Sequence, residues 1–133
     1  MRVPRKRLAE LMKFVAEREG ARLAEVDLAV VGRDEIASLN RNYLHRAGPT
    51  DILSFDLSDS SASGICVQLV VWGDVALEQA RARGLSPQHE LMLYVVHGLL
   101  HVMGYDDTTV RGAAHMHARQ DELLDEFAKG RRH

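Results

Sequence analysis

The segment that begins at Ser86 constrains the fold more than any other part of the sequence. Ser86 is a preferred N-cap residue, and Pro87 suits the first helical position, where its missing N–H is not needed. The helix that follows is apolar on nearly every face, with Leu91, Met92, Leu93, Tyr94, Val95, Val96, Leu99 and Leu100. A helix that is apolar all round is normally buried on all sides. We therefore expect a central helix around which the other elements pack.

Hydrophobic periodicity predicts alternating helices and strands before this central helix. Apolar residues at helical spacing predict helices at residues 4–19, 33–43 and 78–83. Denser apolar runs predict strands at residues 23–31, 51–57, 67–72 and 75–77. The last two runs are interrupted at Gly73-Asp74, where a bulge is the usual meaning of a glycine in a strand.

The composition fits one globular domain over residues 1–133. The chain is 46% hydrophobic and 27% charged, which excludes disordered and coiled-coil classes, and its net charge of −2 provides no global basic field for nucleic acid. No apolar stretch approaches the roughly 20 residues of a membrane span, and no secretion signal is recognisable at the N-terminus. A single cysteine, Cys66, forms no internal disulfide and fits a reducing cytoplasm.

Two histidines within the apolar helix indicate a metal site. Four residues on a helix advance about 400° and rise about 6 Å, so His97 and His101 project from one face, one turn apart. Gly104 can end the helix and turn the chain so that Asp107 supplies a third ligand. Two imidazoles and a carboxylate suit one Zn2+ per chain, and zinc with three protein ligands keeps a position for a water whose pKa falls to about 7. This chemistry is hydrolytic.

Two other interpretations fit a pair of histidines at this spacing. The pair could be core residues hydrogen-bonded to the backbone or to carboxylates, without a metal. The pattern is also similar to that of metzincin peptidases, but those enzymes carry their general base, a glutamate, directly after the first histidine, where this chain has Gly98. The peptidase interpretation is therefore disfavoured. The remaining histidines are expected at the surface: His45, His89, His115, His117 and His133.

Several blocks in order resemble the YbeY family of bacterial metal-dependent endoribonucleases, which act in ribosomal RNA maturation. The family signature His-Gly-x-Leu-His-Leu-x-Gly-Tyr-Asp-His is similar to residues 97–107. Upstream, residues 39–43 and 49–55 resemble its Leu-Asn-x-x-Tyr and Pro-Thr-Asp-Val-Leu-Ser-Phe blocks. Gly73-Asp74-Val75 resembles its Gly-Asp-Ile strand, and Met116 with residues 120–124 resembles its closing helix. The similarity spans most of the chain and thins before Arg33.

The chain departs from the family pattern at two positions. The third ligand of the family is usually histidine, and the matching residue here is Asp107, which is a competent zinc ligand. The family also carries an arginine, placed to engage substrate phosphate, directly after the tyrosine of its upstream block. Leu44 occupies that position, and Arg46 is a possible catalytic substitute because guanidinium binds phosphate in a bidentate way. The alternative is that Arg46 is a solvated loop residue.

The resemblance implies an α/β (α+β) fold with a mixed sheet of about four strands, helices on both faces and the metal-binding helix at the centre. It implies a zinc-dependent, single-strand-specific endoribonuclease in 16S rRNA maturation and ribosome quality control. The expected partners are single-stranded RNA or rRNA and the ribosome or its assembly proteins. RNA contacts would come from a basic cleft drawn from the N-terminal cluster, Arg41, Arg46, Arg81 and Arg83. The alternatives are a zinc hydrolase on another substrate, such as a peptide, and a ribosome-assembly binding module with a structural zinc.

Overall fold

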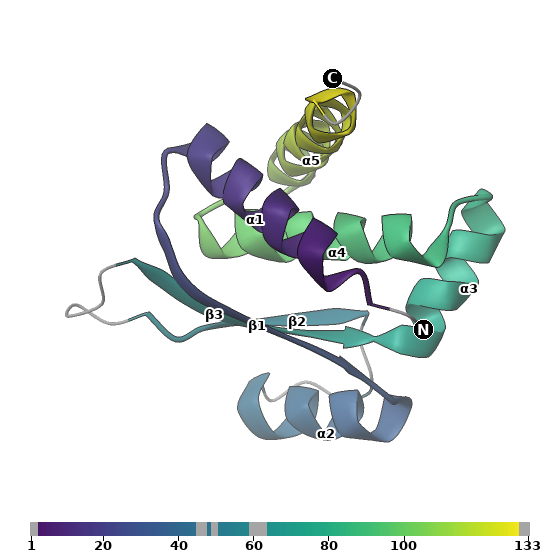
Figure 1. Ribbon diagram of the computed structural model, residues 1–133. Helices are drawn as coiled ribbons and strands as arrows, with labels where there is room; N and C mark the ends of the chain where they lie inside the picture. The colour runs from purple at the N-terminus through teal and green to yellow at the C-terminus, as the bar shows by residue number, and fades with distance from the viewer. Residues whose placement is uncertain (1–2, 45–47, 49–50, 59–63, 131–133) are drawn as a thin grey trace.

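A computed structural model describes residues 3–44, 48, 51–58 and 64–130. A three-stranded mixed sheet in the order β1-β3-β2 lies at its centre (Figure 1). β1 (Leu23–Val31) runs parallel to β3 (Ile65–Trp72), and β2 (Ile52–Asp56) runs antiparallel to it. The α/β class and the mixed sheet are confirmed. The described residues contain three strands, however, where about four were expected.

The strand predicted at residues 75–77 is wrong, because this segment is helical. α3 (Gly73–Arg83) begins directly at the end of β3. Ala76 and Ala80 are buried one helical turn apart, which is a helical and not a strand pattern. Gly73 allows the turn, since a Cβ there would lie only 2.8 Å from a methyl group of Val30 in β1. A run of three residues is too short for periodicity to separate the two states.

The helix α4 (Pro87–Val102) is central, as predicted. It lies along one face of the sheet, with α1 (Arg5–Glu19) and α5 (Val110–Gly130) on its other sides (Figure 1). The N-cap is also as expected, since the Ser86 hydroxyl accepts the backbone N–H of His89 at 3.1 Å. Of the residues that α4 buries, Leu91, Val95, Val96, Leu99 and Leu100 are fully inaccessible to solvent.

Alternation along β3 divides the core between the two faces of the sheet. Val67, Leu69 and Val71 face α4 and the main core. Val70 faces the other way and packs with Leu53 and with Ile36 of α2 (Arg33–Leu44), the helix below the sheet in Figure 1. Helices therefore cover both faces, as expected.

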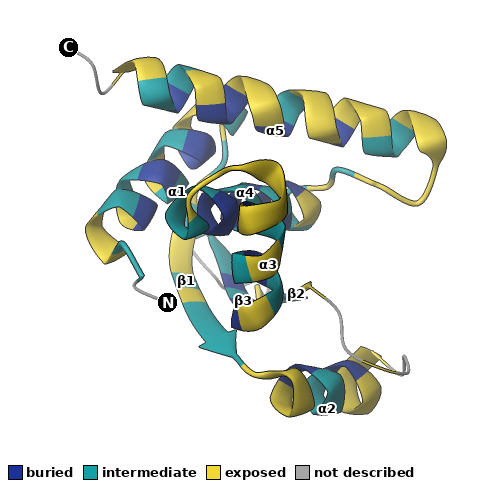
Figure 2. Ribbon diagram, turned by 90° about the vertical axis from the view of Figure 1, so that its right-hand side faces the viewer, coloured by how far each residue is buried: buried dark blue, intermediate teal, exposed yellow. Residues whose placement is uncertain are grey.

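The outer helix α5 shows the amphipathic pattern of a surface element. Figure 2 shows its buried residues as separate patches among exposed ones, and these patches are Met116, Gln120, Leu123, Leu124 and Phe127. No helix among the described residues combines the length and apolarity needed to cross a bilayer.

Candidate functional site

A pocket of about 570 Å³ opens along α4, from Glu90 to His101. Its walls come from α2, β2, the end of α3, α4, the segment that follows α4, and α5. The three ligands predicted from the sequence, His97, His101 and Asp107, all line it. The pocket is therefore where the predicted chemistry would take place.

The His97 ring is held in one orientation by a hydrogen bond to α5. Its Nδ1 lies 3.2 Å from Oε1 of Gln120, a buried residue of α5. With Nδ1 donating to this amide oxygen, the lone pair is on Nε2, which faces Asp107 with 3.7 Å between Nε2 and Oδ2. Burial lowers the pKa of His97, which favours the neutral ring that binds metals. A hydrogen bond from the second ring nitrogen is also typical of metal-binding histidines.

The turn after α4 has the predicted form. The helix ends at Val102, and Gly104 adopts a positive φ of 107°, a conformation that favours glycine. The chain then returns so that Asp107 comes to the same pocket as the two histidines. His101 is exposed at the pocket wall.

The three predicted ligands share the pocket without being gathered around one point. Within the described residues, no three His, Cys, Asp or Glu side chains are close enough to hold one ion as they are placed. His97 and Asp107 are in contact, and His101 does not complete a cluster with them. The donor types and the hydrogen bond that orients His97 suit zinc. Arg46, the predicted catalytic residue, lies outside the described residues.

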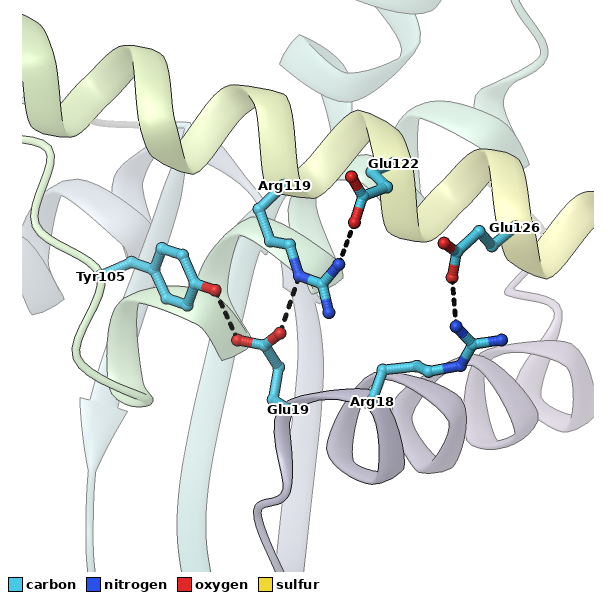
Figure 3. A network of polar contacts seen from close by, with 6 residues as sticks. All are labelled: Arg18, Glu19, Tyr105, Arg119, Glu122 and Glu126. Carbon is cyan, nitrogen blue, oxygen red and sulfur yellow. Dashed lines mark hydrogen bonds and ion pairs between the residues drawn. The ribbon is translucent and has the colours of Figure 1, made fainter.

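The segment that carries Asp107 is tied to two helices by a polar network (Figure 3). The Tyr105 hydroxyl donates to Oε1 of Glu19 at the end of α1, at 2.6 Å. Arg119 of α5 donates from Nε to the other Glu19 oxygen at 2.8 Å, and it also pairs with Glu122. Glu19 and Arg119 are largely buried. The network therefore holds the segment that carries Asp107 against α1 and α5.

Two neighbouring aspartates in this segment have different surroundings. Asp106 turns back on its own backbone, and its Oδ1 accepts the N–H of Thr108 at 2.8 Å. This hydrogen bond lowers the pKa of Asp106. Asp107 instead contacts His97 and lines the pocket. Of the two aspartates, Asp107 is therefore the one that lines the pocket with His97 and His101, and its role as a ligand stays a prediction.

The position after His97 has no space for a side chain. A Cβ on Gly98 would lie 2.6 Å from Leu69 Cδ2 and 3.0 Å from the Ser54 hydroxyl. Gly98 is therefore a point of close approach between α4 and the sheet. A glutamate base of the metzincin kind would not fit here, which is a physical reason against the peptidase alternative.

Two residues of α5 line this pocket without having been predicted as site residues. Gln120 was missed. His117 was predicted to be a surface residue, and its side chain is exposed, yet it lines the pocket with its ring centroid 6.0 Å from that of His97. The signal was available, since residues three apart on a helix share a face. Nothing local, however, indicated that this face would meet α4.

The N-terminal end of α4 supplies a second set of polar residues to the pocket. Glu90 is 1% exposed and accepts from Arg83 of α3 at 3.0 Å. Its second oxygen has no hydrogen-bond donor among the described residues. Burial, with the nearby carboxylates of Asp51 and Glu90, raises the pKa of Tyr94 to about 12, so its phenol keeps its proton at neutral pH. Arg83 was expected among the RNA contacts, whereas Glu90 and Tyr94 were not predicted as site residues.

Comparison with known proteins finds members of one family. A family model described as Endoribonuclease YbeY matches residues 2–128. The endoribonuclease YbeY of Bacillus velezensis is 34% identical over 129 residues, covering 89% of this chain and 82% of that protein. The endoribonuclease YbeY of a Nocardioides species is 37% identical over 128 residues, covering 90% and 86%.

A solved structure has a similar fold. The solution structure of TM1509 from Thermotoga maritima superposes with a TM-score of 0.65 at 26% identity, covering 99% of this chain and 88% of that one. The family match spans nearly the whole chain, including the pocket and every predicted metal ligand. The chain therefore belongs to the YbeY family of endoribonucleases, which are hydrolases.

Proposed function

We propose that the protein is a zinc-dependent endoribonuclease that cleaves single-stranded RNA in the cytoplasm and acts in 16S rRNA maturation and ribosome quality control. Family membership supports the reaction class. The observation that carries the proposal is that His97, His101 and Asp107 line one pocket while Gln120 orients the His97 ring. The ribosome or its assembly proteins are the proposed partners.

The proposed zinc ligands are His97, His101 and Asp107, one ion per chain. His101 is exposed and Asp107 is about two-fifths exposed, and surface side chains change rotamer within nanoseconds, so binding of the ion can gather them. When bound, zinc supplies a Lewis acid that polarises a phosphoryl oxygen. Gln120 keeps Nε2 of His97 available for the ion by occupying Nδ1.

Other residues of the chain would act on the RNA itself. Tyr94 keeps its proton and offers a hydrogen-bond donor to an anionic or carbonyl oxygen in the pocket. Arg46 is proposed to contact the phosphate at the cleaved bond, in place of the family arginine whose position Leu44 occupies. Leu44 lines the pocket and carries no charge. A cationic residue at a different position therefore has to contact the phosphate.

The proposal is tested by metal content and cleavage together. Purified protein should contain about one zinc per chain and should cleave single-stranded RNA. His97→Ala should abolish cleavage while RNA binding remains. Unchanged cleavage by His97→Ala would indicate a contaminating nuclease and would refute the enzyme assignment.

The same experiment separates a structural zinc from a catalytic one. If zinc only stabilises a binding module, its removal should lower the melting temperature with no cleavage to lose. If zinc is catalytic, its removal should abolish cleavage and re-addition should restore it. Cleavage of a peptide but not of RNA would favour the hydrolase alternative, against the evidence of Gly98.

A further inference from the structure

Arg83 is the one lysine or arginine among the described residues that line the pocket. The other charged side chains there are carboxylates, namely Asp51, Glu90 and Asp107. RNA carries one negative charge per phosphate, so a strand that enters this pocket needs cationic contacts to offset both its own charge and these acids. Arg83 is therefore the described residue best suited to meet a phosphate.

Among the described residues, one ion pair holds the guanidinium of Arg83 in place. Its single ion pair in the described structure joins Nη1 to Oε1 of Glu90, which is buried, while the Arg83 side chain remains 54% exposed. A guanidinium has five N–H donors, so most of them stay available for an incoming ligand. A buried carboxylate that orients an exposed guanidinium reduces the entropy lost when the guanidinium then binds phosphate. The two side chains come from adjacent helices, α3 and α4, which meet at the turn on the right of Figure 1.

The distance to the proposed metal ligands decides which phosphate Arg83 would meet. Glu90 and His97 lie on the same helix, seven residues apart, which is about 10 Å at 1.5 Å per residue. One phosphate group cannot contact both ends of such a span. This separation along α4 therefore favours a role for Arg83 at a phosphate further along the strand than the one at the cleaved bond.

We infer that Arg83, positioned by Glu90, forms a subsite for a flanking phosphate of single-stranded RNA in the same pocket as His97 and His101. The inference rests on the proposed function and adds a substrate preference to it. A substrate with phosphates beyond the cleaved bond gains a charge-assisted hydrogen bond that a dinucleotide lacks. Glu90 is a positioning residue in this arrangement.

The test compares a mixed-sequence RNA hexanucleotide with the dinucleotide UpA, using zinc-loaded protein. Arg83→Gln should raise KM for the hexanucleotide about three- to tenfold, the effect of one partly exposed charged hydrogen bond, with little change in kcat. The dependence of log KM on log salt should weaken by about 0.7, the value for one phosphate contact on a single strand. Cleavage of UpA should not change.

Matched variants separate a subsite from a folding defect. Arg33→Gln removes an exposed arginine that also has an acidic neighbour, Asp34, but does not line the pocket, and it should leave both substrates unaffected. Arg83→Gln leaves the buried Glu90 carboxylate unpaired, so Arg83→Gln combined with Glu90→Gln removes both charges and should give the same change in KM. Glu90→Gln alone keeps the cation and should raise KM less than Arg83→Gln.

The possible failures are distinguishable. If Arg83→Gln matches Arg33→Gln in KM and in salt dependence, the subsite is refuted while RNA cleavage by the wild type still supports the proposed function. An equal effect of Arg83→Gln on UpA would also refute a flanking subsite. If wild-type protein loaded with zinc cleaves neither RNA, the proposed function itself fails.

Discussion

At the scale of single residues, the site depends on which of two adjacent carboxylates reaches it. Asp106 is engaged with the backbone of Thr108, whereas Asp107 faces His97. Asp107→Ala should therefore lower the zinc content of the purified protein well below one per chain, because one of the three proposed ligands is lost. Asp107→His, which restores the usual family ligand, should keep zinc, and Asp106→Ala should also keep it. Metal analysis of the three variants checks this prediction, and zinc loss in Asp106→Ala alone would reverse the assignment.

Tyr94 gives a prediction for alkaline pH. Its pKa is about 12 in the folded protein, against about 10 for a tyrosine in the unfolded chain, so between these values the folded state holds a proton that the unfolded state has released. The resulting stabilisation is complete below pH 10 and is lost as the pH rises through about 12. The stability difference between wild type and Tyr94→Phe should therefore shrink over this range. Urea unfolding at several pH values measures it, and a constant difference would contradict the shift.

At the scale of elements, the packing of α4 on the sheet depends on Gly98. Gly98→Ala places a Cβ 2.6 Å from Leu69, which is itself fully buried and has little freedom to move. Overpacking of this kind costs roughly 1–3 kcal/mol, which exceeds the helical preference for alanine of up to about 1 kcal/mol. We expect a net loss of about 1–2 kcal/mol in the free energy of unfolding, measured with urea.

A glycine in another helix provides the control for this variant. Gly130 is the last residue of α5, and a Cβ at this position would meet no neighbouring atom within 4 Å. Gly130→Ala should therefore leave the stability unchanged or slightly higher. Equal stability of Gly98→Ala and Gly130→Ala would show that α4 can move away from the sheet without cost.

The connection between α1, the segment after α4, and α5 depends on Glu19. Tyr105→Phe removes the hydrogen bond to this largely buried carboxylate, and a bond to a charged group is worth about 1.5–3 kcal/mol. Arg119 still pairs with Glu19 in this variant, so we expect the free energy of unfolding to fall by the lower end of this range, about 1.5 kcal/mol. Urea unfolding measures this loss. Zinc affinity should also fall, because the segment holding Asp107 loses an anchor. Unchanged stability and unchanged zinc affinity would show that the network has no positioning role.

At the scale of the whole molecule, the proposed zinc ion joins α4 to the segment that follows it. A ligand that binds only the folded state stabilises it, by about 2.7 kcal/mol at a concentration 100 times its Kd. Zinc added to metal-free wild type should therefore raise the melting temperature by several degrees. His97→Ala should show no such rise. Thermal denaturation measures the melting temperatures of both proteins. A rise of equal size in His97→Ala would show that zinc binds elsewhere on the protein.

Much of the site was predictable because it is local in sequence. The spacing of His97 and His101 puts both rings on one face of a helix, and Gly104 supplies the positive φ that returns Asp107 to that face. The central position of α4 followed from its apolar residues alone. The family blocks in the sequence also identified the enzyme class, which the family match confirmed.

The tertiary structure decided what surrounds these residues. Gln120 and His117 reach the pocket only because α5 packs across α4, and Arg83 does so because α3 turns directly into α4. The helical start of α3, mistaken for a strand, likewise depended on the close approach of Gly73 to β1. The sequence by itself determined which side chains share a helix face, because that depends on backbone geometry within a few residues. Contacts between distant segments depend on how whole elements pack, and no local pattern encodes that packing.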